Sequence, residues 1–94
     1  MYEKENKLMA DRCAIRQSAN GWCIGDSFPI WNESKWTIED PRCREIIREK
    51  FKLNTYNVIT EKWKSWVGEF KGEGKTIAEA ECECIKAICK GIEE

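Results

Sequence analysis

Three cysteines near the C-terminal end have the spacing that most resembles a metal or redox site. Cys82, Cys84 and Cys89 fall within the segment EAECECIKAICK, which spans residues 79–90. Thiolates bind zinc or form disulfides only where the sulfur atoms can come close together. Whether these three cysteines can do either depends on the secondary structure of the segment.

The segment is predicted to be a helix that opens at Thr76 and runs to about Lys90. Thr76 and Glu79 have the spacing of a capping box, in which two side chains bond free backbone N–H groups of the first turn. Gly91 is expected to follow the helix as its C′ glycine. A helix of this length also fits the alanine and isoleucine content of the segment.

Helical geometry then separates the three sulfur atoms. At about 100° per residue, Cys82 and Cys84 point about 160° apart, whereas Cys82 and Cys89 lie about 10.5 Å apart along the axis. Neither pair can share a zinc ion or form a disulfide. We predict that they are small core fillers. The alternative is a metal or disulfide site that also uses residues elsewhere, namely Cys13, Cys23 or Cys43.

Glu81 is the residue of this helix that packing alone leaves unexplained, because it falls within the apolar arc of Ile77, Ile88 and Ile92. Its side chain either reaches past the sheet edge, pairs with an Arg or Lys from another segment, or forms a partly buried carboxylate at a functional site. A hydrolase would combine Glu81 with Asp40 or another carboxylate and a divalent cation. The chain contains no histidine, the commonest general base and metal ligand. No catalytic residue, metal or cofactor is therefore predicted.

Tryptophan is frequent for a chain of this length, with five in 94 residues, and it is enriched at binding hot spots. Trp31 and Trp36 precede a predicted helix that carries three arginines, so bases could stack on the rings and phosphates could meet the guanidinium groups. The alternative is that the tryptophans fill the sheet face and the arginines pair with Glu45 and Glu49. The predicted binding residues are Trp22, Trp31, Trp36, Arg42, Arg44, Arg48 and Glu81.

The local patterns predict an α+β domain, with a small antiparallel sheet of two to four strands packed against three helices in the order α-β(β)-α-β-β-α. An Asp N-cap followed by Pro starts the middle helix. A hairpin with its turn near residues 61–64 follows, and residues 71–74 are expected to be a loop. The predicted elements are an N-terminal helix over 3–17 (within 1–20), strands over 28–31 and 35–38 around a turn at 32–34, the helix from Asp40 to residue 53, strands over 55–62 and 63–70, and the last helix.

Composition limits the compartment and the class of partner. The 94 residues are expected to form one domain, 1–94, and no apolar run approaches the ~20 residues needed to span a bilayer. The N-terminus carries no export signal, so the six cysteines are expected to be reduced thiols in the cytoplasm. The 16 basic and 17 acidic residues are mixed along the chain, which argues against bulk nucleic-acid binding.

Residues 36–92 resemble the phage ABA sandwich domain, a family of small proteins of tailed phages and prophages. The resemblance rests on WVGEF at 66–70, GKTIAEA at 74–80 and ICK at 88–90, with the Asp-Pro helix before them. It implies a phage product in the bacterial cytoplasm and no defined reaction.

The function expected from this resemblance is non-enzymatic antagonism of a host defence system, in the manner of an anti-CRISPR protein, by stoichiometric binding to a host protein. One alternative is a sponge that holds a nucleotide immune signal between Trp and Arg side chains, at the interface of a homo-oligomer. The other is a minor virion or assembly component.

Overall fold

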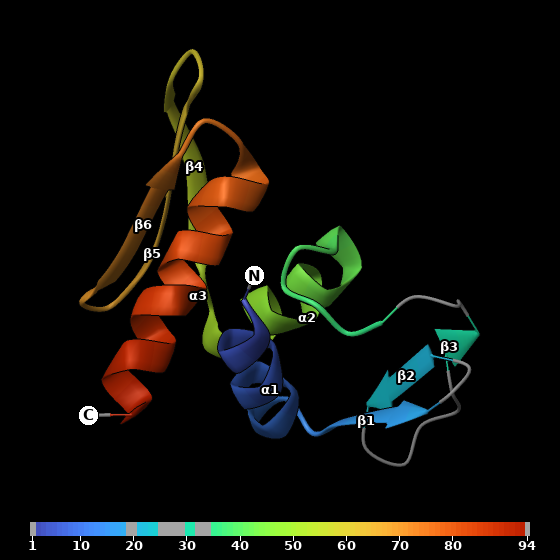
Figure 1. The fold of residues 1–94 in the computed structure, drawn as a ribbon. Helices are drawn as coiled ribbons and strands as arrows, with labels where there is room; N and C mark the ends of the chain where they lie inside the picture. The colour runs from blue at the N-terminus through green and yellow to red at the C-terminus, as the bar shows by residue number, and fades with distance from the viewer. Residues whose placement is uncertain (1, 19–20, 25–29, 32–34, 94) are drawn as a thin grey trace.

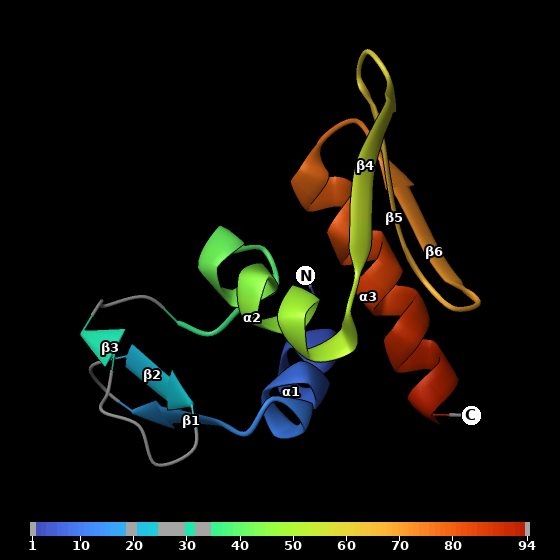
Figure 2. The same cartoon turned by 180° about the vertical axis from the view of Figure 1, so that it is seen from behind.

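The computed structural model describes residues 2–18, 21–24, 30–31 and 35–93, and confirms the α+β class with three helices in these residues (Figure 1). The strands form two antiparallel sheets, with orders β1-β2-β3 and β4-β5-β6, rather than one. The two sheets lie on opposite sides of the helices (Figures 1 and 2). The elements are α1 (Glu3–Arg12), β1 (Ile15–Ser18), β2 (Gly21–Ile24), β3 (Ile30–Trp31), α2 (Pro41–Phe51), β4 (Asn54–Ile59), β5 (Lys62–Val67), β6 (Phe70–Gly74) and α3 (Ile77–Glu93).

The N-terminal helix is shorter than predicted, because it ends at Arg12 instead of near residue 17. Ala14 has a positive φ of 56°, a left-handed conformation that a continuing helix cannot contain. The chain then enters β1, where Ile15 pairs with Ile24 of β2 and packs against the core. Gly21, which was expected to follow the N-terminal helix, begins β2 opposite Ser18.

The tryptophan-rich segment is only partly strand. β3 pairs with β2, with Trp31 opposite Gly21, whereas Phe28, Pro29 and the predicted turn at 32–34 lie outside the described residues. The strand predicted over 35–38 is wrong, because this stretch has no regular structure. Asn6 of α1 holds it instead: its carbonyl accepts from Trp36 Nε1 at 3.0 Å, and its Oδ1 accepts from the Ile38 N–H at 2.8 Å.

Helix α2 begins and faces inward as predicted. The Asp40 side chain accepts from the Arg42 N–H at 2.8 Å, and Pro41 occupies the first turn. Cys43 and Ile47 are buried on the inner face. The helix ends where Lys52 adopts the left-handed conformation, with φ 61°, one residue before Leu53 turns the chain into β4.

The second sheet has a third strand where a loop was expected. The chain reverses after β5 at Gly68, with φ 58°, and Phe70 begins β6, which pairs along β5 from Val67 to Trp63. The prediction that Trp66 and Phe70 share one strand and one face is therefore wrong, as is the loop at 71–74. A short two-residue turn was hidden inside an alternating pattern that continues across it.

Helix α3 lies along one face of this sheet and is longer than predicted (Figures 1 and 2). Thr76 Oγ1 accepts from the Glu79 N–H at 3.1 Å, as a capping box requires. Gly91 is not a C′ residue but lies inside the helix, where the Phe70 ring packs on it and leaves no room for a larger side chain. A Cβ at Gly91 would stand 2.6 Å from that ring.

The buried apolar residues form one cluster drawn from all three helices and from β2, and it contains the edge-to-face pair of Trp22 and Trp36. Val67 and Phe70 of the second sheet are partly buried and pack against it. All six cysteines are free thiols, and five of them are buried. The pKa of Cys82 is raised to about 11, because the effect of burial exceeds the opposing effect of the Arg44 charge. Among the described residues no helix is long and apolar enough to cross a membrane. The buried cysteines are Cys13, Cys43, Cys82, Cys84 and Cys89.

Gly72 sets the distance between α3 and the sheet, and we predict that Gly72→Ala is strongly destabilising. A Cβ there would meet the Cys84 backbone nitrogen at 2.2 Å and the Ala80 carbonyl oxygen at 2.4 Å. Because both atoms are backbone, relief requires the helix to move, so the cost should reach or exceed the upper end of the usual range for overpacking, about 3 kcal/mol. Urea unfolding measures the change.

Gly68→Ala is the matched control for this prediction. Gly68 has a positive φ of 58° and open space around its Cα, so the same substitution adds only backbone strain, of about 1–2 kcal/mol. Equal losses for the two variants would contradict the close approach at Gly72.

Candidate functional site

A buried ion cluster joins α2 to α3 and β4. Glu81 of α3 is 0% exposed and accepts four hydrogen bonds. Arg48 Nε lies 2.7 Å from Oε2 and Arg48 Nη2 lies 2.8 Å from Oε1, a bidentate pair. Arg44 Nε lies 3.2 Å from Oε1, and Thr55 Oγ1 donates to Oε2 at 2.8 Å. Each carboxylate oxygen therefore has two donors.

Arg44 is the more deeply buried of the two cations, with 5% of its surface exposed. Its Nη1 also donates to the carbonyls of Ile38 at 3.1 Å and Glu39 at 2.7 Å. These two carbonyls belong to the irregular segment that precedes α2. Arg44 thereby fixes that segment against α3, and its charge is satisfied by one carboxylate and two carbonyl dipoles.

The chain order explains how the cluster forms. Arg44 and Arg48 are four residues apart, so they project from the same face of α2. Glu81 projects from the buried face of α3, and Thr55 projects from β4 toward α3, where its hydroxyl also bonds Ser65 Oγ at 3.2 Å. Three elements, α2, α3 and β4, thus meet at one carboxylate, and β5 is linked to it through Thr55.

The electrostatics keep Glu81 ionised. Burial raises the pKa of Glu81, but hydrogen bonds from Arg48 and Thr55 and the positive charge of Arg48 outweigh it, so the pKa lies below its usual value. The hydrogen bond with Glu81 in turn raises the pKa of Arg48. Because the pKa of Glu81 is lowered by folding, the cluster stabilises the fold above the usual glutamate pKa. That stability is lost as the pH falls through the lowered pKa.

Of the alternatives for Glu81, pairing with an arginine from another segment is the one the structure shows. Glu81 has no exposed surface and no oxygen without donors, so the acid–base role with Asp40 has no geometric support. The expected pairing of the arginines along α2 is replaced, because Arg44 and Arg48 turn toward Glu81 rather than toward Glu45 and Glu49.

The other predicted binding residues lie apart from this cluster. Trp22 and Trp36 belong to the core, with ring centroids 5.1 Å apart and planes at 79°, so neither presents a face to a ligand. Arg42 lies at the surface and pairs with Asp40 at 3.3 Å. Trp31 is in β3, and its side chain lies outside the described residues. The predicted stacking site of Trp36 beside the arginines of α2 is therefore not formed.

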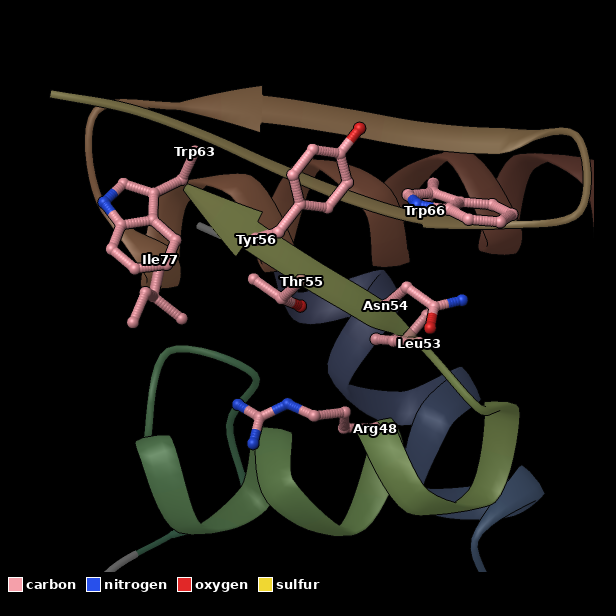
Figure 3. Close-up of a pocket in the computed structure, with 8 residues that line it drawn as sticks. All are labelled: Arg48, Leu53, Asn54, Thr55, Tyr56, Trp63, Trp66 and Ile77. Carbon is pink, nitrogen blue, oxygen red and sulfur yellow. The ribbon is translucent and has the colours of Figure 1, made fainter. Parts of the chain in front are cut away.

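An open cleft of about 820 Å³ lies between α2 and the start of β4, directly beside the ion cluster (Figure 3). Aromatic side chains dominate its walls. Tyr56 is 46% exposed and Trp66 is 40% exposed, although both are large apolar groups. Arg48 is the charged residue that lines it. The lining residues are Arg48, Leu53, Asn54, Thr55, Tyr56, Trp63, Trp66 and Ile77.

Sequence reasoning placed Arg48 in a binding site but missed the aromatic residues around it. Tyr56, Trp63 and Trp66 fall within the predicted strands over 55–62 and 63–70 and are not among the predicted binding residues. The available signal was their alternation along the two predicted strands, which puts Tyr56 and Trp66 on the opposite face of the sheet from Thr55 and Ser65. A helix covers only one face of such a hairpin. Tyr56 and Trp66, on the other face, therefore had no predicted packing partner.

The described part of the chain contains no group of three or more His, Cys, Asp and Glu side chains that could hold a metal ion. Comparison with known proteins found no matching family model, no matching curated protein and no matching solved structure. The resemblance of residues 36–92 to the phage domain therefore remains an expectation.

We predict that Glu81→Gln destabilises the protein by about 3–5 kcal/mol, because it leaves Arg44 buried without a counter-charge. Glu83→Gln is the control, since it makes the same change two residues along α3 at a half-buried position. We expect the control to lie within about 0.5 kcal/mol of the parent. Urea unfolding at neutral pH measures both, and comparable losses would contradict the cluster's structural role.

Proposed function

We propose that this is a non-enzymatic binding protein, and that the cleft beside β4 is the surface that holds its partner. The observation that supports this most strongly is the exposure of Tyr56 and Trp66 in a concave surface that also contains Trp63 and Arg48. Tyrosine, tryptophan and arginine are the residue types that contribute most of the binding energy at protein interfaces. A protein partner would bury rings that are now exposed to water.

The residues that line the cleft include no carboxylate, imidazole or thiol, which supports a binding role over a catalytic one. Arg48 cannot act as a base, and the nearest carboxylate, Glu81, is saturated by arginine and threonine donors. Thr55 also donates its hydroxyl proton to Glu81. Within the lining residues, the groups that remain are the Tyr56 phenol, two indole rings, an amide and aliphatic side chains.

We further propose that the partner is a bacterial host protein and that binding antagonises a host defence system, as an anti-CRISPR protein does. This step is supported by the resemblance to a phage domain and by the small size of the chain, not by any residue of the cleft. The setting would be the cytoplasm of the infected cell.

A nucleotide immune signal is the second candidate ligand, and one observation favours it. Trp63, Trp66 and Arg48 line the same cleft, so bases have rings to stack on and a phosphate has a guanidinium. The stacking site proposed here lies at a different place from the one predicted around Trp31 and Trp36. The open form of the cleft favours a protein over this small ligand.

We predict that the double substitution Tyr56→Ala and Trp66→Ala abolishes capture of the partner while the fold is retained. Both side chains are about half exposed, so truncation should cost little stability. Loss of two hot-spot rings should weaken binding at least about 30-fold. The measurement is affinity capture from bacterial lysate. The captured protein is then titrated against the parent protein and against the double variant.

Ile24→Ala is the matched control, because Ile24 is 38% exposed on β2 and does not line the cleft. It should bind like the parent. If the double variant captures the same protein with the same affinity, the cleft is not the binding surface. Release of an ultraviolet-absorbing small molecule on denaturation, in place of a captured protein, would support the nucleotide instead.

A further inference from the structure

The cleft follows the edge of strand β4 rather than one of its faces. Asn54, Thr55 and Tyr56 are consecutive residues of β4, and all three line it. Successive side chains of a strand point to opposite faces of the sheet. A cleft that touches three in a row therefore runs along the strand's edge, where both faces meet (Figure 3).

That edge carries no strand in the described part of the chain. The sheet order is β4-β5-β6, so β4 pairs with β5 on one side only. The outer edge of a strand presents a row of N–H and C=O groups that can pair with a further strand. Helix α2 lies beyond this edge, and Arg48 extends from it toward β4 (Figure 3).

The walls on either side of the edge are apolar at both faces of the strand. Trp63 and Ile77 lie at one end of the cleft, and Leu53 and Trp66 lie at the other (Figure 3). Trp66 lies opposite Asn54 in the ladder and shares a face with Tyr56, whereas Trp63 lies opposite Asn57 and shares the other face with Thr55. Alternate side chains of an added strand would therefore meet one or the other of these faces.

Arg48 supplies the charge of the cleft and has an unused side. Its Nε and Nη2 bond Glu81, and no described residue accepts from its Nη1. The residue is 39% exposed, whereas its partners Arg44 and Glu81 are buried. An arginine held in this way presents a fixed N–H group to the cleft, and a carboxylate is the side chain that complements it.

We propose that the occupant is an extended peptide segment of a partner protein, which adds a strand to the free edge of β4 and sets an acidic side chain against Nη1 of Arg48. Backbone pairing with β4 provides affinity, and the aromatic walls and Arg48 provide specificity. This inference rests on the proposed binding function and names the mode in which that function is performed.

The test starts from a displayed library of random decapeptides, selected on the full-length protein and counter-selected on the Tyr56→Ala and Trp66→Ala double variant. We expect the selected sequences to alternate apolar and other residues and to share an Asp or Glu at a fixed position. The best sequence is then synthesised with a single backbone N-methyl group at each position in turn, and binding is measured by fluorescence anisotropy.

Strand addition predicts a two-residue period in this scan. N-methylation at residues whose N–H faces β4 should weaken binding about tenfold, and at the alternate residues it should change binding less than about twofold. Changing the acidic residue of the peptide to its amide should weaken binding about tenfold toward the parent protein and toward Arg42→Gln. The same change in the peptide should not alter its binding to Arg48→Gln. Because this change is made in the peptide, it leaves the fold of the protein unaltered.

Three results would overturn the inference. They are a library that yields no peptide dependent on Tyr56 and Trp66, a scan without a period of two, and a protein that forms a dimer through β4 of a second copy. In the first two cases, a host protein captured through the same cleft would leave the binding function standing and remove only the strand-addition mode. Loss of that capture as well would remove both.

Discussion

The ion pair of Glu81 with Arg44 and Arg48 is the interaction on which the arrangement of this fold depends. Helix α3 lies on the β4-β5-β6 sheet, whereas α2 lies on the other side of β4, and Glu81 reaches across to it. Breaking a buried pair of this kind by removing one partner typically costs about 3–5 kcal/mol, a large part of the 5–15 kcal/mol that stabilises a domain. Packing of the apolar core does not substitute for this ion pair.

The cluster also defines the proposed binding surface. Because Glu81 fixes Arg48 by two hydrogen bonds, the guanidinium is held at the mouth of the cleft with one side turned to the core and the other to solvent. A free arginine on α2 would lose side-chain entropy on binding, whereas this one is already ordered. Structural stability and ligand recognition therefore share a residue, and substitutions at Arg48 are expected to affect both.

Local signals in the sequence predicted local structure well, and non-local partners poorly. Asp40-Pro41 and Thr76 with Glu79 marked helix starts because a cap needs only residues within one turn. Glu81 was recognised as an anomaly by helical geometry, but its two arginine partners lie 33 and 37 residues away. Gly91 was misread as a helix end, since no local pattern shows that a distant ring will pack on a glycine.

The same distinction explains the tryptophans, whose exposure depends on which face of the molecule they reach. Trp22 and Trp36 pack against each other in the core, and Trp66 lies on the uncovered side of the second sheet.

The most direct test of the role of the ion cluster is a carboxyl-carbon NMR titration of Glu81. We expect its midpoint below the usual glutamate pKa of about 4.3. A midpoint at or above that value would show that the buried ion cluster does not hold the fold together.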